Sequence, residues 1–381
     1  ISKIESNEPL NELKKIIGIH KSPNLKDMPR FYGGYVGFFA YESAKYAEAK
    51  INNLPMKESK FAEDMPDIYL VKSEKLIVYD NFNQTMQAIY NADPQKISYE
   101  DAQKEIDEIQ NSIDSSSQYR ELEHSDILGQ LEYSSNFTKN EYIAAVKRVK
   151  EYIKEGDVMQ VVLAQDFYKS FEGDSFELYS ALRKLNPSPY MYFLDLDDLQ
   201  IVSSSPEILA KLENSLVTVR PLAGTRRRGL SEIEDSELEK DLLNDEKEVA
   251  EHLMLIDLSR NDIGKVCRPG SVVVSETMAV EKYAHVMHIA SNVQGQLQQN
   301  LKAMDLLKAT LPVGTLSGAP KVRAMQIIDE LEPEKRGVFG GAVGYLSWNG
   351  NMDTAIAIRT GIIKNQVLYV QAGAGVVADS I

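Results

Sequence analysis

The stretch 245–262 reads DEKEVAEHLMLIDLSRND, and the interpretation of the rest of the chain starts from it. Asp245 can cap the start of a helix, because its short side chain accepts hydrogen bonds from unpaired N–H groups there. Apolar residues then recur at helical spacing and predict an apolar stripe of Val249, Leu253 and Ile256. The stretch therefore predicts an amphipathic helix.

The neighbouring face of this helix carries two carboxylates, Glu248 and Glu251, which lie one turn apart. Such charges repel each other unless water solvates them or a cation binds them, and oxygen ligands suit a hard ion such as Mg²⁺. An exposed glutamate pair is the ordinary interpretation of this spacing. Three further charges, Asp257, Arg260 and Asp262, lie in the apolar end of the helix, where unpaired charge is unfavourable. These three charges favour a helix that faces a cleft, and we expect them to be paired with each other or with neighbouring residues.

The composition is that of an acidic globular protein. The chain has 381 residues, 43% hydrophobic and 26% charged, and can form one large or two ordinary domains. A net charge of −15 argues against binding to nucleic acid or to an anionic membrane. The single cysteine, Cys267, excludes a disulfide framework and indicates a reducing compartment, which we take to be the cytoplasm. Since no apolar run reaches about 18 residues, we expect no transmembrane helix.

Three regions follow one another along the sequence. Residues 1–110 form an N-terminal region that we expect to be structural or regulatory and rich in β-strands. Residues 111–137 include a Ser-rich polar stretch without periodicity, which is typical of a linker. Residues 138–381 start with a capping-box pattern, Thr138 and Glu141, and mix helices and strands without a regular βαβ order. These patterns predict an α+β protein with large antiparallel sheets.

Three stretches of the last region carry groups suited to catalysis. The turn 220–229, RPLAGTRRRG, places the hydroxyl of Thr225 beside three arginines. His285 and His288 lie three residues apart, which favours a functional role over two packed core histidines. Thr315 lies in a glycine-rich turn whose spacing does not fit a phosphate-binding P-loop. Each of these signals is weak by itself.

Two strand-like stretches near the end of the chain could bind carboxylate groups of a ligand. Arg359 suits two parallel hydrogen bonds to a carboxylate. Gly373 and Gly375 would let backbone N–H groups approach a second carboxylate. Together with the glutamates, hydroxyls and histidines, these groups describe a cleft for a small polyanionic metabolite. The residues alone do not identify the substrate.

From about residue 138 onward, the ordered string of motifs resembles the chorismate-utilising enzymes. The motifs include GDVMQVVLAQ, SSSPE, RPLAGTRRRG, DEKEVAEHLMLIDLSRNDIGKV, LPVGTLSGAPKVRAMQIIDELE and QAGAGVVADS. Within this family the sequence is most similar to the large subunits (component I) of anthranilate synthases. The resemblance implies a single large α+β unit, with two packed antiparallel β-sheets, helices outside and a central active-site cleft.

The resemblance also implies an activity. Enzymes of this kind require Mg²⁺, add ammonia to chorismate and eliminate pyruvate to give anthranilate, in the first step of tryptophan biosynthesis. A partner glutamine amidotransferase supplies ammonia from glutamine, and tryptophan is a feedback inhibitor. An aminodeoxychorismate synthase component I would carry a nucleophilic lysine where this chain has Ala223. An isochorismate synthase would carry a water-activating lysine where it has Gln160, so both positions favour direct attack by ammonia.

The residue roles of the family map onto matching positions of this sequence. The resemblance places Glu248 and Glu251 in the metal region, with Glu251 as the better candidate ligand, and assigns His288 to proton transfer and loss of the 4-hydroxyl group. His285 is expected to pack or cap. The other expected site residues are Gln160, Thr225 and Thr315 for catalysis; Arg359, Gly373, Gly375, Thr225 and Phe339 for substrate binding; and Pro189, Tyr190 and Met191 for tryptophan.

Two segments that the resemblance implies do not occur in the sequence. One is the N-terminal part of the tryptophan site, and the other is a C-terminal segment that supplies a second pair of metal carboxylates. We therefore expect the natural chain to extend past Ile381. The alternative is a truncated, non-catalytic binding scaffold.

Overall fold

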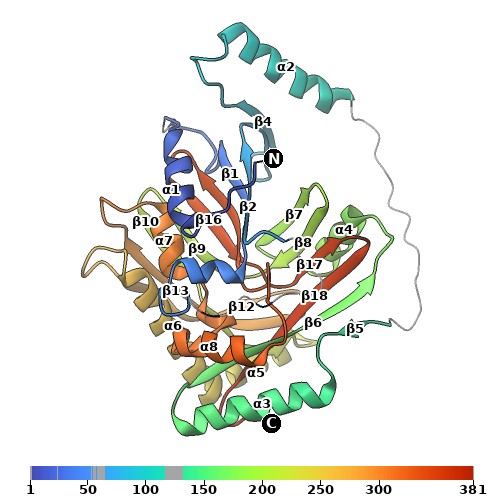
Figure 1. Ribbon diagram of the computed structural model, residues 1–381, viewed down its shortest axis with the longest axis vertical. Helices are drawn as coiled ribbons and strands as arrows, with labels where there is room; N and C mark the ends of the chain where they lie inside the picture. Colours follow the sequence, from blue (N-terminus) through green and yellow to red (C-terminus); the bar gives the residue numbers. More distant parts are fainter. Residues whose placement is uncertain are drawn as a thin grey trace.

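Two antiparallel sheets form the centre of the molecule in a computed structural model that describes residues 2–23, 25–52, 54, 57, 65–115 and 132–380 (Figure 1). In spatial order, the larger sheet contains β11 (Leu222–Arg227), β13 (Val286–Gln296), β10 (Leu216–Val219), β9 (Ile208–Glu213), β16 (Met352–Ile356), β15 (Ala342–Ser347), β1 (Gly34–Phe39) and β2 (Ile68–Ser73), and β12 (Val273–Lys282) also pairs with β13.

The second sheet is built around two long strands. In spatial order it contains β14 (Gly318–Ala319), β6 (Gln160–Ser170), β18 (Val367–Val376), β17 (Thr360–Lys364), β8 (Leu199–Ser205) and β7 (Tyr190–Leu196), and β5 (Ser134–Ser135) also pairs with β6. β6 pairs with β18 along its whole length, whereas β17 pairs only with residues 367–370 of β18. No described strand pairs with residues 371–376 of β18 on the side away from β6.

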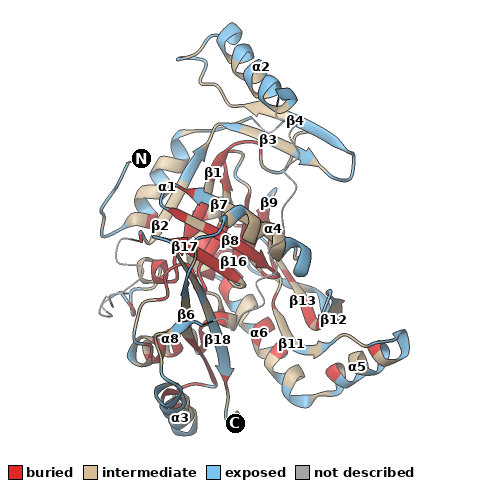
Figure 2. Cartoon of the chain, turned by 90° about the vertical axis from the view of Figure 1, so that its right-hand side faces the viewer, coloured by how far each residue is buried: buried red, intermediate tan, exposed pale blue. Residues whose placement is uncertain are grey.

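The two sheets pack against each other through an apolar cluster. It contains Val162 and Ala164 from the second sheet together with Leu212, Ala342 and Leu346 from the first, each at most 5% exposed. Figure 2 shows buried residues concentrated in the middle of the molecule, on β1, β8, β16 and β17. The predicted α+β class with two packed antiparallel sheets is confirmed.

The helices lie around the outside of the sheets (Figure 1). They are α1 (Pro9–Ile19), α2 (Tyr99–Ser115), α3 (Lys139–Glu155), α4 (Ser175–Leu185), α5 (Glu232–Asn244), α6 (Glu246–Gly264), α7 (Ala303–Thr310) and α8 (Lys321–Leu331), with 3₁₀ helices η1 (Tyr41–Tyr46) and η2 (Gly314–Leu316). α3 starts with the predicted capping box between Thr138 and Glu141, and it ends at Gly156 in a left-handed conformation with φ of 84°. The hairpin β3–β4 (Lys75–Asp80 and Thr85–Tyr90) and α2 project from one end of the molecule (Figures 1 and 2).

The predicted helix at 245–262 is confirmed as α6, but its buried stripe differs from the prediction. Asp245 caps the helix by accepting hydrogen bonds from the N–H groups of Lys247 and Glu248. Leu253, predicted to lie on the apolar stripe, is 49% exposed. The buried residues are instead His252, Leu255, Ile256, Asp262 and Ile263. The helix packs against β11, β13 and α7. This packing, rather than the number of apolar residues on a face, determines which face of the helix turns inward.

The charges at the end of α6 are paired, as predicted. Asp262 is 8% exposed, and its Oδ2 accepts a hydrogen bond from Nζ of Lys321 at 2.5 Å. Asp257 and Arg260 pair with each other at 3.1 Å but lie at the surface, with side chains 69% and 54% exposed. Only the Asp262 pair is therefore removed from water.

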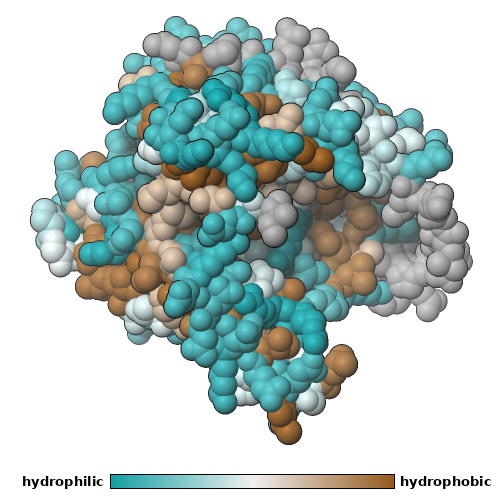
Figure 3. Space-filling view, turned by 90° about the horizontal axis from the view of Figure 1, so that it is seen from below, coloured by the Kyte–Doolittle hydropathy of each residue, from teal (hydrophilic) through white to brown (hydrophobic). Residues whose placement is uncertain are grey.

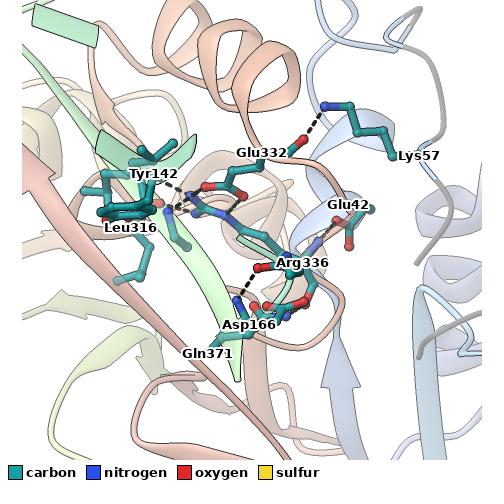
Figure 4. A network of polar contacts seen from close by, with 12 residues as sticks. Glu42, Lys57, Tyr142, Asp166, Leu316, Glu332, Arg336 and Gln371 are labelled. Carbon is teal, nitrogen blue, oxygen red and sulfur yellow. Dashed lines mark hydrogen bonds and ion pairs between the residues drawn. The ribbon is translucent and has the colours of Figure 1, made fainter. Parts of the chain in front are cut away.

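A buried arginine connects elements that carry expected site residues (Figure 4). The guanidinium of Arg336, 4% exposed, donates to both carboxylate oxygens of Glu332 and to the carbonyl oxygens of Val162 on β6 and Leu316 in η2. Gln371 on β18 donates in turn to the carbonyl oxygen of Arg336 at 2.8 Å. These bonds fix β6, β18 and η2 relative to one another.

The N-terminal region contributes strands to the larger sheet, where β1 pairs with both β2 and β15. Of the predicted linker, residues 111–115 belong to α2 and residues 134–135 form β5, while 116–131 lie outside the described residues. In the described parts of the chain, no helix is long and apolar enough to cross a membrane.

Figure 3 shows that polar side chains cover most of the face seen from below, with hydrophobic ones around a recess.

Candidate active site

Glu251 of α6 meets β6 and β18 at one place. Nε2 of Gln160, the first residue of β6, donates to Oε1 of Glu251 at 2.7 Å. Gly375 on β18 lies beside this pair, because a Cβ atom at that position would be 2.7 Å from Gln160 Nε2 and 3.9 Å from Glu251 Oε1. The fold thus brings together three expected site residues that are distant in the sequence.

Glu248 lies one turn before Glu251 and faces β11. A Cβ atom on Gly224 would be 3.3 Å from its Oε2, and Nη1 of Arg226 lies 3.6 Å from its Oε1. Burial, and next the negative charge of Glu251, raise the pKa of Glu248 above its ordinary value. Two oxygen ligands that repel each other in this way fit a hard cation such as Mg²⁺. In the described residues, no group of three or more His, Cys, Asp or Glu side chains could hold a metal ion.

The ring of His288 on β13 is held in one tautomer by β11. Its Nδ1 lies 2.9 Å from the carbonyl oxygen of Gly224 and 3.1 Å from Oγ1 of Thr225. Because a carbonyl oxygen only accepts hydrogen bonds, Nδ1 carries the proton and Nε2 keeps its lone pair. Burial lowers the pKa of His288, so the ring is neutral at pH 7. Tyr283 packs against it, with ring centroids 5.6 Å apart. His288 is therefore arranged to accept a proton at Nε2.

A buried carboxyl group that was not among the predicted site residues lies near Thr315 and Arg359. Glu207, between β8 and β9, is 5% exposed, and burial raises its pKa to about 8. The backbone of Leu222 and the charge of Arg359 oppose part of this rise. Glu207 is therefore protonated at pH 7 and can donate a proton. The motif SSSPE was the available signal, since it places a carboxylate directly after a buried strand.

Arg359 lies between β16 and β17, in a left-handed backbone conformation with φ of 50°. No described residue forms a hydrogen bond or ion pair with its guanidinium, and burial lowers its pKa below the ordinary value. Its charge acts on both Glu207 and His288. An unpaired, half-buried guanidinium in this position fits an anionic group of a ligand.

The backbone N–H groups of Gly373 and Gly375 point away from β6. The two glycines lie opposite Ala164 and Val162, whose own N–H groups donate to partners on the far side of β6. In an antiparallel pair, directly opposed residues either exchange hydrogen bonds or both point outward. Both glycines therefore present their N–H groups to the side of β18 that β17 leaves uncovered, where a carboxylate can bind them.

The remaining expected residues lie apart from these groups. Phe339 is 5% exposed within the apolar cluster between the sheets. The imidazole of exposed His285 contacts the carbonyl oxygen of Leu185 at the end of α4, with Nε2 at 3.0 Å. Tyr190 donates to Oδ1 of Asp353 at 2.8 Å, and it lies with Pro189 and Met191 at the β7 edge of the second sheet, opposite the edge formed by β14 and β6.

Known proteins of one family resemble this chain over nearly its whole length. Residues 2–381 match the family model described as chorismate binding enzyme. The chain is 50% identical to anthranilate synthase component 1 of Pseudomonas aeruginosa over 377 residues, 98% of this chain and 76% of that protein. It is 47% identical to the protein of the same name from Aquifex aeolicus, over 99% of this chain and 76% of the relative.

A solved structure agrees with these relatives. Anthranilate synthase component I from Streptococcus pneumoniae superimposes with a TM-score of 0.89 at 41% identity, covering all of this chain and 83% of that one. Both the sequence and the fold therefore match one group of proteins. This chain belongs to the family of chorismate binding enzymes.

Proposed function

We propose that this chain converts chorismate to anthranilate as component I of an anthranilate synthase. The observation that carries the proposal is a proton donor and a proton acceptor near the same arginine: Glu207 is protonated at pH 7, and His288 is neutral with a free Nε2. An environment that raises the pKa of a carboxyl group keeps it protonated, so that it can act as an acid. An environment that lowers the pKa of an imidazole keeps it unprotonated, so that it can act as a base. The reaction needs both, because a hydroxyl group leaves and a ring proton is removed.

Separate groups bind the two carboxylates of chorismate. Arg359, which has no other partner among the described residues, binds the enolpyruvyl carboxylate. The outward N–H groups of Gly373 and Gly375 bind the ring carboxylate. Glu248 and Glu251 would hold Mg²⁺, which would supply positive charge to stabilise an anionic substrate.

Proton transfer is divided between the acid and the base. Glu207 donates its proton to the 4-hydroxyl group, which leaves as water while ammonia forms a C–N bond at the ring carbon next to the carboxylate-bearing carbon. Nε2 of His288 then takes the proton from that ring carbon as the C–O bond to the enolpyruvyl group breaks, and the enolate that leaves takes this proton back from His288 to give pyruvate. Thr225 helps to hold the imidazole through its contact with Nδ1. In this scheme Glu207 assists the loss of the hydroxyl group. That role was expected for His288, which here removes the ring proton.

The nucleophile in this scheme is ammonia. Gln160 is not a base at neutral pH, and its Nε2 is already bonded to Glu251. Ala223 on β11 offers no amine. We further propose that a glutamine amidotransferase partner supplies the ammonia, and that Pro189, Tyr190 and Met191 contribute to a tryptophan site.

The test is a product assay with the purified chain, chorismate, Mg²⁺ and ammonium ions. We expect anthranilate, which is detected by its fluorescence, and pyruvate in equal amount. Aminodeoxychorismate or isochorismate as the product would overturn the proposal. The variant Glu207→Gln keeps the shape of the side chain but has no acidic proton, and it should lower kcat by roughly 10²–10⁴-fold.

A further inference from the structure

A small cavity adjoins Glu207 and Thr315. Its volume is ≈ 30 Å³, and its other walls come from the second half of α6, from the turn between β10 and β11, and from the segment between α7 and η2. His288, Arg359 and the two glycines of β18 are not among the described residues that line it. The cavity is therefore distinct from the groups proposed to hold chorismate.

One atom in the wall of this cavity lacks a partner. Oγ1 of Thr315 is buried and forms no hydrogen bond with any described residue. Buried polar atoms almost always bind protein groups or ordered water. A bound water needs a cavity of roughly 10–15 Å³ and at least two polar partners. The volume here is enough for about two water molecules, and the hydroxyl of Thr315 and the carboxyl of Glu207 both line it.

Other residues of the wall are polar, and some of them are less buried. Ser259 and Arg220 line it there, and both are partly exposed. Asp262 also lines it, and its two carboxylate oxygens are bonded to Lys265 and Lys321. Water in the cavity would thus lie between the buried Glu207 and side chains that reach solvent.

We propose that this cavity is a water-binding site through which Glu207 regains a proton from solvent after each turnover, an inference that rests on the function proposed above. Glu207 loses one proton when the 4-hydroxyl group leaves as water. The carboxylate that remains takes a proton from a bound water, and solvent restores the proton of that water. The nitrogen that was added releases one proton to solvent, which balances the proton that Glu207 takes up, so each turnover returns the protein to its starting state.

A crystal structure of the full chain tests the site itself. We expect at least one ordered water within about 3.2 Å of Oγ1 of Thr315, with a second polar partner in the same cavity. An empty cavity at a resolution that shows other buried waters would overturn the proposal. This outcome does not depend on the reaction, so it leaves the proposed function untouched.

Kinetics of a cavity-filling variant test the role in proton return. Leu258 lines the cavity, whereas Leu253 on the same helix is 49% exposed and does not line it, so Leu258→Phe and Leu253→Phe form a matched pair. In Leu258→Phe the first turnover, which uses the proton already on Glu207, should keep its wild-type rate. Steady-state turnover should fall by about tenfold, with a larger solvent deuterium isotope effect, because proton return becomes limiting. Leu253→Phe should match the wild type.

Ser259→Leu fills the same cavity from another wall position and replaces Leu258→Phe if that variant fails to fold. A filled variant with an unchanged steady-state rate, or with first and later turnovers slowed equally, would overturn the inference. Absence of a first turnover in the wild type would instead reject the proposed function.

Discussion

At the scale of single residues, Glu207 and His288 set opposite limits on the pH range of the reaction. Glu207 has a pKa of about 8, so the acid is lost and kcat/KM should fall as pH rises through that value. The pKa of His288 lies below its ordinary 6.5, so the base is lost only when pH falls below that value. Because these pKa values are those of the protein without substrate, we expect a bell-shaped profile of kcat/KM when it is measured between about pH 5 and 10. A kcat/KM that stays constant up to about pH 10 would contradict the role of Glu207.

The two histidines provide a matched pair of variants. His288→Ala should lower kcat by roughly 10²–10⁴-fold with little change in KM for chorismate, because Arg359 and the glycine N–H groups still bind the substrate. His285→Ala removes one exposed contact to a carbonyl oxygen and should change kcat much less. Steady-state kinetics and thermal melting of both proteins distinguish the roles. Equal losses of kcat with equal losses of stability would show that both histidines are structural.

Glu251 accepts a hydrogen bond from Gln160 and is the carboxylate proposed to bind Mg²⁺. Glu251→Gln removes the charge needed for Mg²⁺ but keeps the size of the side chain, so we expect activity to be lost and the melting temperature to be retained. Titration with Mg²⁺ during the chorismate assay is the measurement. Wild-type activity at the same Mg²⁺ concentration would reject a metal role for this carboxylate.

At the scale of elements, the Arg336–Glu332 pair holds β6, β18 and η2 in place. Arg336→Met would leave the carboxylate of Glu332 buried without its cation, which costs about 3–5 kcal/mol of unfolding free energy. Arg323 pairs with Asp157 where both side chains are 37% exposed, and Arg323→Met should cost at most about 1 kcal/mol. Denaturant unfolding of the two variants measures the difference. Similar losses would mean that burial of the pair is unimportant.

Local patterns in the sequence predicted the elements better than their orientation. The capping box of Thr138 and Glu141 and the left-handed Gly156 are local features, and both were predictable as the bounds of α3. The face of α6 that turns inward depends on distant β11 and β13, so Leu253 was placed wrongly. Glu207 was not among the predicted site residues for a similar reason, because its proton affinity arises from burial by segments far away in the sequence.

At the scale of the whole molecule, the net charge of −15 opposes the approach of an anionic substrate. Salt screens such long-range repulsion, whereas the short contacts to Arg359 are screened much less. We therefore expect kcat/KM for chorismate to rise modestly, by less than about threefold, between roughly 10 and 150 mM KCl. A steep fall of kcat/KM over this range would show that local positive charge, rather than the net charge of the protein, governs the rate at which enzyme and substrate meet.

The place of β1 between β15 and β2 has a consequence for the biogenesis of the protein. Gly34 lies opposite Ser347, and Val161 of β6 lies opposite Val376, so each sheet joins segments made at very different times. Neither sheet can close on the ribosome until nearly all of these residues have been synthesised, and its apolar strands remain unpaired until then. The nascent chain is thus exposed to aggregation throughout translation, and its yield in a cell depends on whatever shields it during that interval.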